Sequence, residues 1–235
     1  MSGRVSGTET GAGYVREMFG RVAPRYDLLN HLLSLNIDRH WRRRVARRFR
    51  NVLAQPEARV LDLCCGTGDL ALALQREGVA QIIASDFCHP MLTRAATKQV
   101  PMLVEADALG LPFANNSVDL ITVAFGFRNL ADYDGGLREM LRLLRPGGQV
   151  GILEFSEPET PVFAQLYRFY FRHVLPHLGG AISGDPHAYT YLPASVRRFP
   201  SPDELAQRMR EAGFQEVAFE RFTFGVACLH TGSKG

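Results

Sequence analysis

The feature that most constrains this chain is a short segment, RVLDLCCGTGD at residues 59–69. It joins an apolar run containing Asp62 to a turn with Gly66 and Gly68, and a helical run follows. Glycine lets the backbone approach a ligand closely, and the first N–H groups of a helix have no partner within that helix. A strand, a glycine turn and a helix in this order predict the edge of an α/β sheet that binds a nucleoside cofactor.

Charge at this turn separates two kinds of cofactor. Residues 66–71, GTGDLA, also satisfy the relaxed G-x-G-x-x-G/A pattern of dinucleotide sites. A pyrophosphate, however, would meet two carboxylates here, Asp62 and Asp69. The same carboxylates would attract a cofactor with a cationic sulfonium and an α-amino group. The turn therefore predicts S-adenosylmethionine (SAM) rather than NAD, with Asp62, Gly66 and Gly68 in the binding site.

Strand-like and helical runs alternate along the rest of the chain. Residues 82–85 read as a buried strand that ends at Asp86, about twenty residues past the turn, where such folds place an acid on ribose hydroxyls. Alternation of this kind predicts a parallel sheet with helices on both faces. We expect a third strand that ends within 104–108 and further strands at 118–124 and 150–153. We also expect helices at 136–144 and 202–212, and an antiparallel pair of strands at 217–222 and 225–230.

The length of 235 residues favours one α/β domain with additions. We expect a flexible tail at 1–13 and a single domain at 14–235, with a helical cap at 14–55 and a substrate-side insertion at 157–200. The cysteines include adjacent Cys64 and Cys65 but no C-x-x-C pair, so we expect no metal site and a reducing, cytoplasmic location. No apolar stretch reaches the ~20 residues of a membrane span.

Residues 40–50, HWRRRVARRFR, carry a dense run of positive charge. The favoured interpretation is a helix that buries Trp41, Val45 and Phe49 and leaves its arginines in water. Contact with an anionic lipid surface or with nucleic acid are the alternatives.

Two apolar segments indicate contact with a lipophilic substrate or with another apolar surface. The insertion holds an aromatic-rich helical run at 163–175, which is apolar around much of its circumference. Core packing, including the subunit interface of a homodimer, is one interpretation, and a wall or lid over a lipophilic substrate is the other. The helical cap has the same apolar character as the insertion, with Tyr26 and Asp27 set among leucines.

The loop after the strand at 118–124 reads FGFRN at residues 125–129. Open α/β sheets bind ligands at the carboxyl ends of their strands, so this loop is expected to face the transferable methyl group. It lacks the Asn/Asp-Pro-Pro-aromatic segment of nucleobase amine methyltransferases and the Pro-Cys of cytosine-C5 enzymes. Arg128 is either a structural ion-pair partner or, as we favour, a substrate contact together with Asn129.

Five segments together resemble the menaquinone/ubiquinone C-methyltransferase family. The resemblance covers nearly the whole chain after the tail, and FGFRN and the C-terminal segment are more specific than the glycine turn. It implies a seven-stranded SAM-dependent methyltransferase (Rossmann-like) sheet with an antiparallel C-terminal edge and helical lid elements. It also implies SAM contacts at Thr67, Asp86, Asp107 and Ala108. The five segments are YDLLN at 26–30, LDLCCGTGD at 61–69, FGFRN at 125–129, LRPGG at 144–148 and FTFGVA at 222–227.

The resemblance further implies methylation of a ring carbon of a polyprenyl quinol. A quinolate is a better carbon nucleophile than the neutral quinol, and Arg128 stays protonated at any working pH. We therefore assign Arg128 to quinolate stabilisation or water orientation, with Asn129 and Tyr26 completing the catalytic set. Asp27 and His173 are further candidates to take the proton.

Demethylmenaquinol is the favoured substrate, and the Cys-Cys turn and lack of a presequence point to bacterial menaquinone synthesis. The alternative substrates are a polyprenyl benzoquinol, another small lipophile and nucleic acid. Of these, nucleic acid is not expected as a partner. A SAM-fold protein that only binds is argued against by the intact Arg128 and Asn129. Because the substrate resides in the bilayer, we expect transient contact with the inner face of the membrane.

Overall fold

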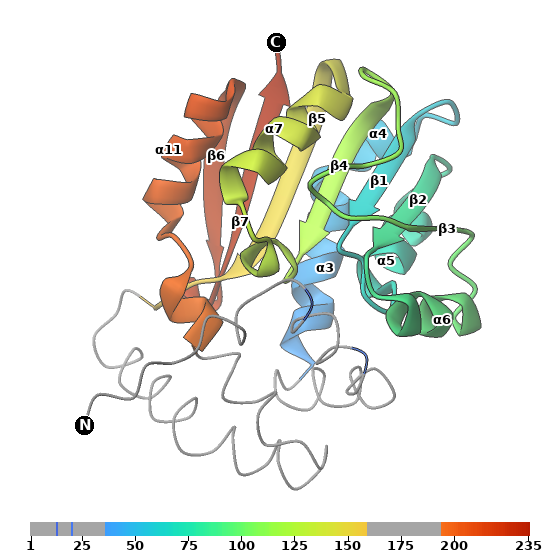
Figure 1. The fold of residues 1–235 in the computed structure, drawn as a ribbon, viewed down its shortest axis with the longest axis horizontal. Helices are drawn as coiled ribbons and strands as arrows, with labels where there is room; N and C mark the ends of the chain where they lie inside the picture. Colours follow the sequence, from blue (N-terminus) through green and yellow to red (C-terminus); the bar gives the residue numbers. More distant parts are fainter. Residues whose placement is uncertain (1–12, 14–19, 21–35, 159–193) are drawn as a thin grey trace, which may run out of the picture.

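The strands form where apolar, β-branched runs are bounded by turn residues. The computed structural model describes Gly13, Gly20 and residues 36–158 and 194–235, which carry a seven-stranded sheet of order β3-β2-β1-β4-β5-β7-β6 (Figure 1). β1 to β5 are parallel, and β7 runs antiparallel to both of its neighbours. The strands are β1 (Arg59–Leu63), β2 (Gln81–Asp86), β3 (Met102–Glu105), β4 (Val118–Ala124), β5 (Leu144–Phe155), β6 (Phe214–Phe222) and β7 (Ala227–Lys234).

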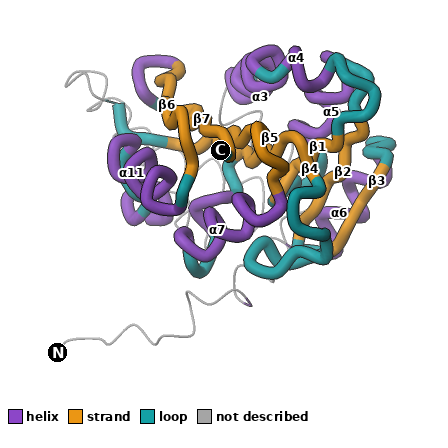
Figure 2. The backbone as a smooth tube through the Cα atoms, turned by 90° about the horizontal axis from the view of Figure 1, so that it is seen from above, coloured by secondary structure: helices purple, strands orange, loops and turns teal. Residues whose placement is uncertain are grey.

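Helices cover both faces of the sheet (Figure 2). On one face lie α3 (Ile37–Arg48), α4 (Arg50–Leu53) and α5 (Asp69–Glu77), and on the other lie α7 (Tyr133–Leu143) and α11 (Pro202–Ala212). α6 (His89–Thr97) packs against β2 and β3. Two short 3₁₀ turns are η2 (Phe127–Asn129) and η4 (Thr223–Gly225).

Each central strand contributes to two hydrophobic cores. Because side chains alternate along a strand, Val60 of β1 joins the core beneath α3 and α5, whereas Leu61 joins the core beneath α7. β4 divides in the same way, with Leu120 and Ile121 on opposite faces. A sheet buried on both faces explains why these strands read as nearly continuous apolar runs.

Most predicted helices and strands are confirmed, and the differences concern the residues at which they begin or end. The strand at 118–124 and the helix at 202–212 have the predicted bounds, and β6 and β7 pair antiparallel as expected. The helix predicted at 136–144 begins earlier, at Tyr133, because the Asp132 side chain caps it by accepting a hydrogen bond from Gly135 N. β5 already begins at Leu144, and its pairing with β4 shifts register between Val118 and Leu120.

The predicted tail apart from Gly13, half of the helical cap and most of the insertion lie outside the described residues. So do Tyr26, Asp27, His173 and the segment 163–175. No helix in the described ranges is both long and apolar enough to cross a membrane.

Candidate active site

A pocket opens at the carboxyl ends of β1, β2 and β4. Its wall combines the glycine turn after β1, the end of β2, the loop at 106–109 and the loop after β4. Six of the predicted cofactor residues line it: Asp62, Gly66, Thr67, Asp86, Asp107 and Ala108. The structure thus brings together residues that are far apart in the sequence, at the sheet edge where the sequence placed the cofactor.

Gly68 shapes the turn from behind the wall. Its φ of 84° is left-handed, and a Cβ at this position would lie 2.4 Å from Val100 Cγ2. Glycine is therefore required for both conformation and space. Lys98 Nζ braces the same turn, donating to Thr67 Oγ1 at 3.0 Å and to Asp69 Oδ1 at 2.7 Å.

Asp62 is a buried carboxyl group on the pocket wall, with 1% of its surface exposed. It lies opposite Thr122 of β4, whose hydroxyl donates to Asp62 Oδ1 at 3.1 Å. Oδ2 makes no hydrogen bond of normal geometry with the described residues. Burial raises the pKa of Asp62 to about 7, while Thr122, the N–H of Ala71 and the charge of Arg42 lower it less. A buried, incompletely satisfied carboxylate attracts a cationic donor group.

Asp86 both holds the turn and faces the pocket. Its Oδ2 accepts the N–H of Gly66 at 2.8 Å, and its Oδ1 accepts the N–H of Cys88 at 2.9 Å. Burial raises its pKa, and these N–H groups partly offset the increase. Asp86 therefore has a structural task in addition to the ribose contact predicted from the sequence.

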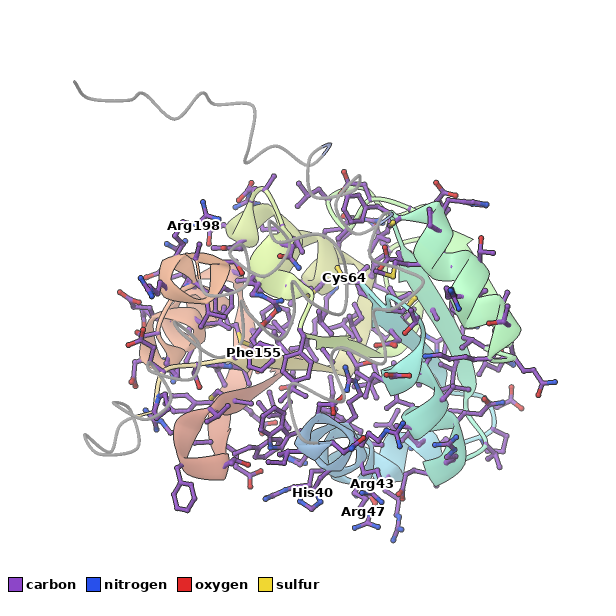
Figure 3. The ribbon with its side chains drawn as sticks, turned by 90° about the horizontal axis from the view of Figure 1, so that it is seen from below. His40, Arg43, Arg47, Cys64, Phe155 and Arg198 are labelled. Carbon is purple, nitrogen blue, oxygen red and sulfur yellow. The ribbon has the colours of Figure 1, made fainter. Side chains whose placement is uncertain are left out.

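Cys64 and Cys65 also lie on the pocket wall (Cys64 is labelled in Figure 3). Burial raises the pKa of both thiols well above the usual value, and nearby carboxylates add to the effect. Both thiols are therefore protonated at neutral pH and unsuited to nucleophilic attack. Cys64 instead fixes loop spacing, since a Cβ on Gly126 would lie 2.4 Å from Cys64 Cβ.

The two loop residues predicted to be catalytic occupy different positions. Asn129 lines the pocket, whereas Arg128 is not among its described lining residues. The Arg128 guanidinium forms a buried ion pair with Glu154, donates to the carbonyl oxygen of Phe125, and bonds Ser195 Oγ at 3.3 Å. These contacts are the ones expected if Arg128 is a structural ion-pair partner. Contact between Arg128 and the substrate stays a prediction.

The sequence did not indicate that Arg42 of α3 belongs to the pocket. The expectation that the arginines of this helix lie in water is wrong for Arg42. Arg42 is only 8% exposed, pairs with Asp38, and places its guanidinium carbon 5.2 Å from the centroid of the Phe125 ring. It lines the pocket. A helical wheel carries the missing signal, because positions 38, 41, 42, 45 and 46 form the buried stripe of α3. The predicted burial of Trp41, Val45 and Phe49 is confirmed.

The charges on this wall fit SAM. Carboxylates of Asp62, Asp69, Asp86 and Asp107 face the pocket, with Arg42 as the basic residue among its described lining residues. This excess of negative charge suits a cationic sulfonium with an α-ammonium group and disfavours a pyrophosphate. Across the described ranges, no group of His, Cys, Asp and Glu side chains is arranged to hold a metal ion.

Comparison with known sequences gives matches over almost the whole length. The family model described as "ubiE/COQ5 methyltransferase family" matches residues 7–234. The chain is 48% identical over 226 residues to a demethylmenaquinone methyltransferase of Deinococcus radiodurans, covering 94% of this chain and 92% of that protein. It is 48% identical over 223 residues to one from Thermus thermophilus, covering 92% and 100%. A ubiquinone/menaquinone biosynthesis C-methyltransferase UbiE of Geobacter sulfurreducens is 43% identical over 232 residues, covering 94% and 88%.

Solved structures share the fold at low sequence identity. The [4+2]-cyclase SpnF superposes with a TM-score of 0.68 at 17% identity, covering 95% of this chain and 96% of that one. A phosphoethanolamine N-methyltransferase 2 of Haemonchus contortus, solved with S-adenosyl-L-methionine, gives 0.56 at 14% identity, covering 76% and 49%. These two likenesses show the fold and carry no assignment of substrate.

Proposed function

This chain belongs to the ubiE/COQ5 methyltransferase family, and on that premise we propose that it converts demethylmenaquinol to menaquinol. It is a SAM-dependent C-methyltransferase of quinone biosynthesis. The observation that carries the choice of substrate is the 48% identity to two proteins named demethylmenaquinone methyltransferase, one of them matched over its entire length.

When bound, SAM supplies a methyl group on a sulfonium that is already a good leaving group. We assign Asp62 to its α-ammonium group and Asp86 to its ribose hydroxyls, with Thr67, Asp107 and Ala108 completing the contacts. The left-handed backbone at Gly66 and Gly68, with φ angles of 54° and 84°, shapes the turn that borders the proposed cofactor site. The burial of Asp62 and Asp86 supports the assignment, because a charged partner gains most where water is excluded.

The loop after β4 provides the groups proposed for catalysis. Asn129 lines the pocket, and we assign it to orienting the substrate ring. Arg128 fixes this loop through Glu154. We assign its positive charge to favouring the quinolate form. Tyr26, from the part of the chain that the structure does not describe, is the third proposed member. Holding the reacting groups in line is worth several kcal/mol, up to roughly 10.

The proposal includes transient contact with the inner face of the membrane, where a polyprenyl quinol resides. α3 presents the exposed residues Arg43, Arg44, Arg47 and Arg48 on its outer face, and Figure 3 shows Arg43 and Arg47 directed away from the sheet. Each such residue near an anionic surface contributes about 1 kcal/mol. We place the reaction in the cytoplasm, in keeping with four cysteines that are all in the thiol form. A homodimer through the segment 163–175 is part of the same proposal.

The test is the quinone composition of a strain in which the gene is deleted. Mass spectrometry of extracted quinones should show demethylmenaquinone accumulating, and a plasmid-borne copy should restore menaquinone. Normal menaquinone together with loss of a methylated benzoquinone would favour the benzoquinol alternative. Unchanged quinones would favour another lipophile or nucleic acid.

A further inference from the structure

Arg42 comes from a helix outside the glycine turn, yet it belongs to the cofactor pocket. Among the described lining residues it is the basic one, facing a wall rich in carboxylates. A buried arginine is costly unless it is paired or meets a ligand. Asp38 supplies one partner through an ion pair within α3, and the Phe125 ring lies 5.2 Å from the guanidinium carbon. Both contacts hold the guanidinium in place.

Arg42 and Asp62 lie on the same side of the sheet. Asp62 follows Val60 by two positions, so its side chain is directed to the face of the sheet that packs against α3. Arg42 lies on that helix, on the buried stripe with Trp41 and Val45. Its charge acts on Asp62 directly, since Arg42 is one of the groups that lower the pKa of that carboxyl. A carboxylate and a guanidinium thus border the same space.

This pair of opposite charges has a chemical counterpart in SAM. The methionyl group carries an ammonium and a carboxylate on one carbon, so it needs an anionic and a cationic partner close together. Arg42 has five N–H donors, and one of them contacts Asp38 Oδ2. A planar guanidinium suits a carboxylate better than any other side chain does.

We propose that Arg42 binds the α-carboxylate of the methionyl group of SAM, opposite the α-ammonium site at Asp62. The proposal rests on the assignment of this pocket to SAM and on the ammonium contact at Asp62, and it is independent of the quinol substrate. It makes α3 part of the cofactor site, so the positive run at 40–50 serves two purposes. Arg42 faces inward to the ligand, while Arg43, Arg44, Arg47 and Arg48 face outward.

The first test uses the wild-type protein and ligands that differ by one group. Calorimetry should give tight binding of S-adenosylhomocysteine, the demethylated product, and about 10- to 100-fold weaker binding of its decarboxylated analogue, S-adenosyl-3-thiopropylamine. Equal affinity for the two ligands would overturn the proposal. Failure of S-adenosylhomocysteine itself to bind would instead contradict the assignment of the pocket.

The second test uses Arg42→Gln, with Arg43→Gln as the matched control on the outer face. Arg42→Gln should weaken S-adenosylhomocysteine by about 10- to 100-fold and leave 5′-methylthioadenosine, which lacks the amino-acid group, within about twofold of wild type. Arg42→Lys should recover part of the loss, and Arg43→Gln should change neither affinity. Equal loss of both ligands in Arg42→Gln would show that Arg42 only supports the pocket. If the single variant is unstable, Asp38→Asn combined with Arg42→Gln removes the buried carboxylate that has lost its ion pair with Arg42.

Discussion

Arg128 and Glu154 form an ion pair inside the protein, with Arg128 Nη1 3.0 Å from Glu154 Oε2 and side chains 6% and 1% exposed. Glu154 also accepts the backbone N–H of Arg128 at 3.1 Å. The arginine lies in the turn after β4 and the carboxylate lies on β5, which pairs with β4. The pair therefore ties the 125–129 loop to the neighbouring strand, and Asn129 of that loop lines the pocket. Separating buried charges of this kind is costly.

Arg128→Lys should reduce methyl transfer by at least about tenfold and leave the affinity for S-adenosylhomocysteine almost unchanged. A lysine keeps the charge but cannot reach Glu154, the Phe125 carbonyl and Ser195 together. Single-turnover methylation and calorimetry measure the two quantities. Arg138→Lys, at an exposed ion pair on α7, is the control. A single-turnover rate equal to wild type would show that the guanidinium fork is not needed for the reaction.

Asp86→Ala should weaken S-adenosylhomocysteine binding by about 1.5–3 kcal/mol, as expected for lost hydrogen bonds to a charged group. It should also lower the free energy of unfolding, because Asp86 accepts the N–H groups of Gly66 and Cys88. Calorimetric titration and urea unfolding measure these effects. Asp203→Ala, at a carboxylate whose side chain is 81% exposed, is the control. Wild-type affinity in folded Asp86→Ala protein would remove Asp86 from the site.

Asp62 should make stability and cofactor binding depend on pH in opposite directions. Its pKa in the folded protein is about 7, above the ordinary value of 3.8, so the folded state holds the proton more tightly than the unfolded state. Its contribution to stability is therefore complete below about pH 4 and is lost as pH rises through 7, by up to about 4 kcal/mol.

Asp62→Asn should abolish this dependence. Urea unfolding at pH 5 and pH 8 should show a smaller loss of stability at pH 8 in the variant than in wild type. Binding of S-adenosylhomocysteine to wild type should strengthen between pH 6 and pH 7.5 as Asp62 ionises, and Asp62→Asn should bind weakly at every pH. Parallel pH profiles for the two proteins would contradict this account of Asp62.

The outer face of α3 should bind anionic vesicles and not neutral ones, with binding reduced by salt. Arg44 already pairs with Glu220, and Arg47 with Glu77, so Arg43 and Arg48 should contribute most. Replacement of all four arginines by glutamine should abolish co-sedimentation. Glutamine at Arg197 and Arg198 is the control, since Figure 3 shows Arg198 well away from α3. Equal binding to both vesicle types would leave the four arginines as a solvated helix face.

The sequence predicted elements well where the signal is local. Helix α11 begins where Ser201 and Glu204 form a capping box with Pro202 in the first turn, and the glycine turn after β1 has its own pattern. The sequence alone could not predict contacts that depend on tertiary packing. Arg42 is one of several arginines in a row, and only the packing of α3 on the sheet selects it for the interior. The ion pair of Arg128 joins residues 26 positions apart on different elements.

The most direct test of the central claim is methyl transfer by the purified protein from SAM with a deuterated methyl group. Reduced demethylmenaquinone and the matching reduced demethylated benzoquinone are offered at equal concentration, and the products are analysed by mass spectrometry and NMR. The account predicts deuterated methyl on the ring carbon of the naphthoquinol, in clear preference to the benzoquinol, and a markedly slower reaction in Arg128→Lys. Preferential methylation of the benzoquinol, or transfer to oxygen instead of carbon, would contradict it.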